Sequence, residues 1–185
     1  MPAITTYHFS VTEFEKLHEA GILGEDDRVE LLNGELLAMA PIGSDHRNLV
    51  DLLTEILVDQ RQGRYRVAVQ NPIRLDDYSE PLPDLVLYRI DRQGPHPTPA
   101  DIFLLIEVAE SSIEYDSGTK LRTYARSGIG EVWIIDLAAR KTYIYRSPEP
   151  TSGAYAVMDV APWIASLSPA TFPDIQIGLS RLLPD

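Results

Sequence analysis

Two apolar runs separated by one helical pattern constrain the fold of this chain more than any other feature. Residues Asp101–Ala109 and Glu131–Asp136 are short and rich in branched apolar side chains, which is typical of buried strands. Between them, Ser117–Ser127 places apolar side chains on one helical face, and Gly128 is suited to end that helix. Because a strand, a helix and a second strand in this order form a right-handed parallel crossover, we expect a mixed α/β protein.

Further elements are predicted on both sides of this crossover. They are a capped helix from Ser10 to about Gly21, a hairpin with an Asn-Gly turn over Val29–Leu37, a helix over about Ser44–Gln62, and strands over Tyr65–Leu75, Asp84–Ile90, Lys141–Arg146, Tyr155–Asp159 and within Phe172–Leu183. No repeat, linker or low-complexity tract interrupts the 185 residues. The pattern therefore favours one domain spanning residues 1–185.

Composition excludes several classes of protein. The chain has no cysteine, so it can form neither a disulfide framework nor a thiolate metal site. The sequence MPAITTYHF lacks the basic start and apolar run of a signal peptide, and no apolar stretch approaches the roughly 20 residues that span a bilayer. We therefore expect a cytoplasmic protein that does not enter the membrane.

A net charge of −12 argues against a broad basic surface of the kind that nucleic-acid-binding proteins usually carry. Any basic footprint must be local. Two groups are candidates, although the favoured interpretation of each is a set of scattered side chains on a solvated face: Arg61, Arg64 and Arg66, or Lys120, Arg122 and Arg126.

Two carboxylates stand out by their position at predicted strand ends. Asp84 follows Pro83 and opens an apolar strand, and Glu107 lies near the C-terminal end of the next strand. Sequential strands are often neighbours in a sheet, so the two acids could converge. Paired carboxylates suit Mg²⁺, which prefers oxygen ligands. The four histidines show no metal-ligand spacing, and no nucleophile elbow, phosphate-binding loop or zinc-protease motif is present.

Structural interpretations of the same residues remain open. Asp84 could cap a turn, Glu107 could pair with Arg74 or Arg89, and Lys120 could be a solvated helix lysine. Neither spacing nor composition decides between these interpretations and a metal site.

An ordered set of motifs spans about Ser10 to Leu183. It consists of the hairpin Glu30–Glu35, His46 at the start of a helix, Pro83-Asp84, Ile106-Glu107-Val108, the pattern Tyr-Asp-x-x-x-Lys-Leu-x-x-Tyr-Ala over Tyr115–Ala125, and Glu131–Asp136. This set resembles the Uma family of putative restriction endonucleases in the PD-(D/E)XK nuclease superfamily. The resemblance implies a restriction-endonuclease-like mixed β-sheet flanked by helices, with an N-terminal helix and β-hairpin.

The chain departs from the superfamily pattern at one position. The pattern would place a lysine two residues after the acid, as Glu-x-Lys, but that residue here is Ala109. The resemblance implies that Lys120 replaces it from the following helix. A helix that follows a strand starts near the C-terminal end of that strand, so the ammonium could reach the same site.

The resemblance also implies a mechanism, in which Asp84, Glu107 and the Val108 carbonyl hold Mg²⁺, with Mn²⁺ as a substitute. The ion would activate a water for phosphodiester hydrolysis, and Lys120 would position that water or neutralise phosphate oxygens.

Three residues have supporting roles in this scheme. Glu30 would add a carboxylate at or behind the metal, although alternation with its neighbours also fits an outward-facing strand residue. His46 would orient a phosphate or water, or be structural. Asp116 would cap the helix that carries the lysine.

The sequence is compatible with three functions. The preferred one is an Mg²⁺-dependent endonuclease hydrolysing phosphodiester bonds in DNA, and a homodimer would match the two antiparallel strands of its substrate. The second is a catalytically inactive nuclease-fold protein that binds nucleic acid or a protein partner, which the acidic composition and the residue at 109 favour. The third is an enzyme acting on a small phosphorylated substrate, against which the missing nucleotide-binding loop weighs.

Overall fold

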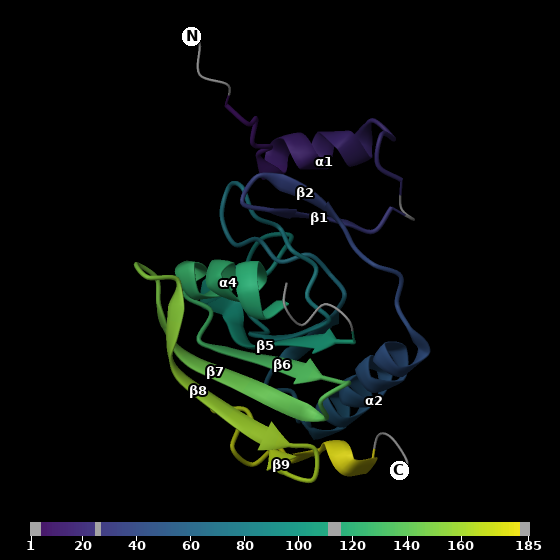
Figure 1. Ribbon diagram of the computed structural model, residues 1–185, viewed down its shortest axis with the longest axis vertical. Coiled ribbons are helices and arrows are strands. Elements are labelled where there is room, and N and C mark those ends of the chain that lie inside the picture. The colour runs from purple at the N-terminus through teal and green to yellow at the C-terminus, as the bar shows by residue number, and fades with distance from the viewer. Residues whose placement is uncertain (1–4, 25–26, 111–115, 182–185) are drawn as a thin grey trace.

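The computed structural model describes residues 5–24, 27–110 and 116–181, and its centre is a six-stranded sheet (Figure 1). Its strands, in spatial order, are β3 (Arg66–Val69), β4 (Leu85–Tyr88), β5 (Ile102–Ala109), β6 (Glu131–Asp136), β7 (Lys141–Glu149) and β8 (Ala154–Pro162). β5 and β6 pair in parallel, and every other neighbouring pair in this sheet is antiparallel. The expected mixed α/β fold and its parallel crossover are confirmed.

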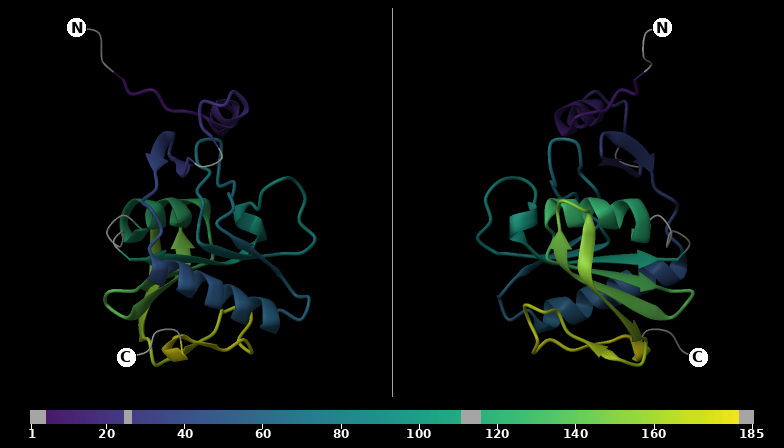
Figure 2. Two further views of the ribbon diagram at one scale, coloured as in Figure 1. Left: turned by 90° about the vertical axis from the view of Figure 1, so that its right-hand side faces the viewer. Right: turned by 60° about the vertical axis from the view of Figure 1, so that its left-hand side comes forward.

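Helices cover both faces of the sheet (Figure 2). α2 (Ser44–Gln60) packs Leu49 and Leu53 with Leu104 and Ile106 of β5. α4 (Leu121–Ser127) packs Tyr124 on the other face, in the same cluster as Leu105. This division follows from the alternation of side chains along a strand, and it places Glu107 on the α4 face with Leu105.

The expected helix over Ser117–Ser127 is present in two parts. A π-helical turn, η2 (Asp116–Lys120), leads directly into α4, and Gly128 ends α4 with a φ of +82°. The positive φ confirms the glycine C-cap, because residues with a Cβ rarely adopt it. The predicted capping by the Asp116 side chain falls outside the part of the chain whose side chains are described.

The N-terminal elements form a small unit on the α4 side of the sheet, beyond that helix (Figures 1 and 2). It contains α1 (Val11–Glu19), with the predicted capping box at Ser10, and the hairpin of β1 (Val29–Leu32) and β2 (Glu35–Ala38). Val11, Phe14 and Leu31 make a separate apolar cluster between them. Backbone hydrogen bonds in both directions between Leu31 and Glu80, at 3.4 and 2.8 Å, join this unit to the rest of the protein.

One predicted strand is wrong in extent. The strand expected over Tyr65–Leu75 stops at Val69, because Gln70 has a φ of +49° and Pro72 has no N–H to donate. The last strand expected within Phe172–Leu183 is present as β10 (Ile177–Gly178), which pairs with β9 (Ser166–Leu167). Short 3-10 turns complete the structure, η1 (Pro99–Asp101) before β5 and η3 (Leu179–Arg181) after β10.

Candidate active site

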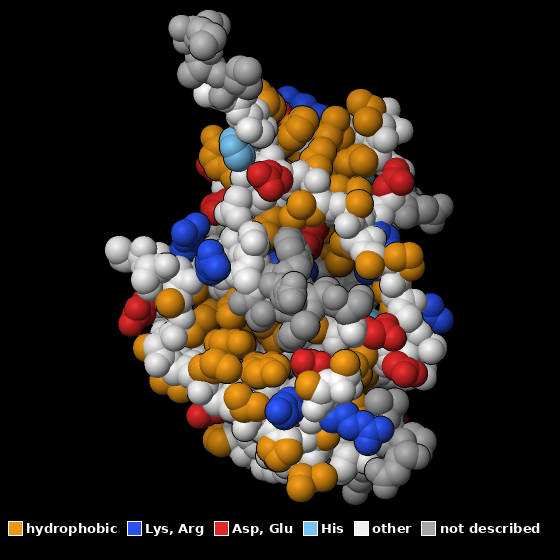
Figure 3. Space-filling model, in the orientation of Figure 1, with side chains coloured by type: hydrophobic (Ala, Val, Ile, Leu, Met, Phe, Trp, Pro, Cys, Tyr) orange, Lys and Arg blue, Asp and Glu red, His pale blue; other side chains and the backbone are white. Residues whose placement is uncertain are grey.

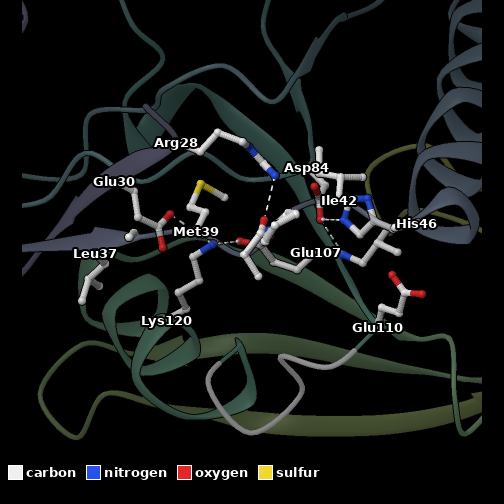
Figure 4. Close-up of a pocket in the computed structure, with 15 residues that line it drawn as sticks. Arg28, Glu30, Leu37, Met39, Ile42, His46, Asp84, Glu107, Glu110 and Lys120 are labelled. Atoms are coloured by element: carbon white, nitrogen blue, oxygen red, sulfur yellow. Dashed lines mark hydrogen bonds and ion pairs between the residues drawn. The ribbon is translucent and has the colours of Figure 1, made fainter. Parts of the chain in front are cut away.

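A cavity of about 380 Å³ lies where the β1–β2 hairpin, the start of α2 and the adjoining ends of β4 and β5 meet (Figure 4). Six of the residues that the sequence singled out line it: Glu30, His46, Asp84, Glu107, Val108 and Lys120. They come from elements that lie far apart in the sequence, and the structure brings them together.

Asp84 precedes β4 directly, and the pairing of Leu85 with Ile106 sets it beside the end of β5. Its Oδ2 accepts hydrogen bonds from the Val108 N–H at 2.8 Å and from His46 Nε2 at 3.0 Å. Because an ionised carboxylate only accepts, the Nε2 atom of His46 carries a proton. This contact assigns His46 a definite task, which is to hold the Asp84 carboxylate.

The Asp84 carboxyl group is kept ionised by its neighbours. Only 6% of the residue is exposed, and burial, the largest single influence, would raise its pKa. The hydrogen bonds and charge of His46, the Val108 N–H and Gln70 Nε2, which lies 3.1 Å from Oδ1, together lower the pKa below its usual 3.8. A buried carboxylate is therefore maintained at neutral pH.

Lys120 lies between two acids in the same cavity. Its Nζ is 3.1 Å from Glu107 Oε1 and 3.2 Å from Glu30 Oε2, and all three residues are at most 3% exposed. The Tyr124 hydroxyl donates to the same Glu107 oxygen at 2.5 Å, and the Leu82 N–H donates to Glu30 Oε2 at 3.2 Å. The predicted reach of the lysine from the helix side to the end of β5 is what the structure shows.

These contacts overturn three of the structural interpretations. Lys120 is not a solvated lysine and Glu30 is not an outward-facing strand residue, because the hairpin turns Glu30 toward α4. Asn33 helps to fix this orientation, since its side-chain amide donates to Thr123 Oγ1 at 3.0 Å. Glu107 pairs with Lys120 rather than with either arginine that the sequence suggested.

Those two arginines bind other acids. Arg74 contacts Glu15, Asp77 and Glu80, and Arg89 contacts Asp91.

Each of the two candidate basic groups has one member that is engaged elsewhere. Lys120 is buried, and Arg64 forms an ion pair with Asp174 at 2.8 Å. On the face shown in Figure 3, Lys and Arg side chains are scattered among acidic ones. The surface seen there has no broad positive stripe for nucleic acid.

Gln70 and Tyr124 are contacts of the site that sequence reasoning did not assign. Tyr124 belongs to the motif that contains Lys120 and could have been placed from its helical spacing of four residues. Gln70 gave no signal, because its contact with Asp84 depends on the chain leaving β3 with a positive φ.

The chemistry of the cavity suits a hard divalent cation, because its carboxylate oxygens and main-chain carbonyls are the ligands that such ions prefer. Asp84, Glu107 and Val108 offer both kinds of oxygen. Across the described residues, no group of three or more His, Asp or Glu side chains is already arranged around a metal position. Within the same part of the chain, no helix combines the length and apolarity needed to cross a membrane.

Comparison with known proteins identifies the family and the fold of the chain. The model of the Uma2 family, described as "Putative restriction endonuclease", matches residues 11–180. No curated protein matches the chain. A crystal structure of a putative nuclease belonging to DUF820 from Anabaena variabilis superposes with a TM-score of 0.72 at 15% identity, covering 94% of this chain and 97% of that one. That likeness shows a shared fold. Because the family model covers most of the sequence, the chain belongs to the Uma2 family of putative restriction endonucleases.

Proposed function

We propose that this protein is a metal-dependent endonuclease that hydrolyses phosphodiester bonds in DNA, with Mg²⁺ as its metal and Mn²⁺ as a substitute. The observation that carries the proposal is the meeting of two buried carboxylates, Asp84 and Glu107, with the Lys120 ammonium in one cavity.

Each residue has a task in this reaction. Asp84, Glu107 and the Val108 carbonyl would hold the metal, which when bound would supply an activated water and offset charge on the phosphate. His46 keeps Asp84 ionised and oriented. The Lys120 ammonium neutralises charge that grows on the phosphate oxygens as the water attacks. Glu30 supports the reaction by holding Lys120 from the side opposite Glu107.

Lys120 compensates for the absence of a lysine at position 109, where Ala109 is buried against the α4 side of the sheet. The Lys120 ammonium lies within 3.1 Å of the carboxylate that the Glu-x-Lys pattern would place next to a lysine. Lys120 therefore supplies a cation at the Glu107 carboxylate, although β5 itself carries no lysine.

Cleavage assays with isosteric variants test the proposal. We expect the purified protein to nick or cut plasmid or oligonucleotide DNA with Mg²⁺ or Mn²⁺ and to be inactive in EDTA. Asp84→Asn and Glu107→Gln should abolish cleavage, whereas Asp136→Asn should retain it. Asp136 is a matched control because it is a buried acid at the end of β6, bonded to the Ala139 N–H and outside the cavity lining. Wild-type protein that leaves every DNA form intact with both metals would refute the proposal.

A second candidate is a nuclease-fold protein that binds nucleic acid or a protein partner without turnover. The ion pairs of Lys120 with Glu30 and Glu107 favour it, because they already neutralise one carboxylate of the proposed metal set. Calorimetric titration with Mn²⁺ separates the two candidates. Metal binding that disappears in Asp84→Asn, together with cleavage lost in the same variant, excludes the inactive candidate.

The proposed partner is DNA, and a homodimer would present two sites related by a two-fold axis to its two antiparallel strands. Sedimentation equilibrium of the protein with and without a duplex oligonucleotide tests the dimer. A single-protomer mass in both conditions would contradict it.

A further inference from the structure

The candidate active-site cavity has two unlike walls. One wall carries the charged and polar groups described above. The other is apolar and comes from the end of β2 and the segment that leads to α2, where Leu37, Met39, Pro41 and Ile42 line the space (Figure 4). A metal ion, a water and a phosphate group need only the polar wall. The apolar wall therefore indicates that the natural ligand also has a substantial apolar part.

The reactive groups lie deep in this cavity. Asp84 is 6% exposed, and Glu107 and Lys120 are each 3% exposed, so a phosphate must enter the cavity to reach them. The volume of about 380 Å³ is at the small end of the roughly 300–1,000 Å³ typical of small-molecule sites. A stacked duplex, which stays straight over about 150 base pairs, is too wide and stiff to follow its phosphate into such a space.

The surface around the cavity is also not suited to binding a long DNA duplex. A protein that grips duplex DNA neutralises many phosphates at once, whereas this chain has a net charge of −12 and scattered basic side chains on the face shown in Figure 3. Arg28 is a partly exposed cation among the lining residues, and its guanidinium donates to the Ala40 carbonyl at 2.9 Å. This position suits contact with one or two phosphates of a strand entering the cavity.

We propose that the cavity admits one nucleotide that has left its base stack, so that the substrate class is DNA with unpaired nucleotides, as in single strands, mismatches or distorted duplexes. This inference rests on the proposed function. The phosphate faces Lys120 and Asp84, and the base lies against the apolar wall. Enzymes that take a base out of the helix hold it between aromatic or apolar side chains, and the polarisable thioether of Met39 adapts to the face of any base.

Two readouts test the proposal, one of which does not depend on cleavage. The first compares cleavage of one labelled sequence as a perfect duplex, a duplex with a central unpaired nucleotide, and a single strand. Because an unpaired nucleotide has already lost its pairing energy, we expect its strand to be cut at least about tenfold faster than the perfect duplex. The second follows 2-aminopurine fluorescence at the unpaired position in EDTA. The fluorescence should rise as wild-type protein unstacks this base.

Variants of the apolar wall connect both readouts to the cavity. Ala40→Trp places a large side chain at the cavity from an exposed position and leaves the acids and Lys120 intact. It should remove the fluorescence rise and slow cleavage of the unpaired substrate at least about tenfold. Met39→Ala should weaken both effects. Ala156→Trp, at an exposed position on β8 outside the cavity, is the matched control and should change neither.

Each outcome decides between the proposals. Equal cleavage of paired and unpaired DNA, with no fluorescence rise, overturns the nucleotide pocket but leaves the endonuclease in place. Absence of cleavage on every substrate refutes the endonuclease, and a fluorescence rise lost in Ala40→Trp would then still support the pocket. Absence of both signals removes both proposals.

Discussion

Replacing Lys120 with methionine should reveal how strongly the candidate active site and the stability of the fold depend on each other. Methionine keeps an unbranched stem but removes the ammonium that lies 3.1 Å from Glu107 and 3.2 Å from Glu30. Two buried carboxylates would then face each other without this cation. Removing one member of a buried ion pair costs about 3–5 kcal/mol. This is a large part of the roughly 5–15 kcal/mol that stabilises a typical domain.

Urea unfolding at pH 7 measures the effect. Trp133 is fully buried, so its fluorescence reports on the packed sheet. We expect Lys120→Met to lower the unfolding midpoint while the slope stays the same, which indicates a change in stability rather than in compactness. Lys16→Met is the control, because Lys16 is an exposed residue in α1 and its replacement should change stability by about 0.5 kcal/mol or less.

A second substitution identifies the source of the loss. Adding Glu30→Gln to Lys120→Met removes one of the two facing charges, so the double variant should be more stable than Lys120→Met alone. A loss below about 1 kcal/mol in Lys120→Met, the value of an exposed ion pair, would refute the reasoning that Lys120 is held as a buried cation. A double variant less stable than both single ones would also contradict it.

Three further predictions concern other parts of the fold. Gly34→Ala should destabilise by about 1–3 kcal/mol in thermal or urea unfolding, because Gly34 has a φ of +82° and a Cβ there would come within 2.5 Å of His8 Cβ; unchanged stability would contradict the described turn. Ser10→Ala should cost about 1 kcal/mol by removing the N-cap of α1, and Ser10→Asp should restore most of it. Burial raises the pKa of Glu80, so its folded state holds the proton more tightly and stability falls as pH rises from the usual 4.5 through the folded pKa. Glu80→Gln should flatten that fall despite the nearby Arg74, and an unchanged pH profile of unfolding would refute the assignment.

The parts of the fold that were predicted correctly are those whose signal is local. The branched apolar runs of β5 and β6, the helical spacing of α2 and the Asn-Gly turn of the hairpin each follow from residues within one element. β3 was predicted too long for the same reason, because an apolar pattern continues past Val69 whereas the backbone turns at Gln70. A positive φ at a non-glycine residue leaves little trace in a sequence.

The contacts of the candidate site also divide into those that a local sequence signal predicts and those that depend on how distant elements dock. The closeness of Lys120 to Glu107 could be anticipated, because a strand and the helix that follows it are joined by a short connection. The burial of Glu30 could not be anticipated, since it depends on how the hairpin docks against α4, and side-chain alternation within β1 carries no information about that contact. His46 was recognised by its position in a motif, but its bond to Asp84 is a contact between residues 38 positions apart.

The contact between Glu30 and Lys120 has a consequence for the synthesis of the chain. Asn33 and Thr123, which join the same two elements, are 90 positions apart, and Glu30 and Lys120 have the same separation. Domains tend to fold from the N-terminus as the ribosome releases them, but the hairpin cannot bury its acid until the lysine has emerged. In an incomplete chain that lacks Lys120, Glu30 therefore stays exposed and the candidate active site is not assembled. If the protein cuts DNA, a chain whose synthesis has not yet passed Lys120 is therefore inactive.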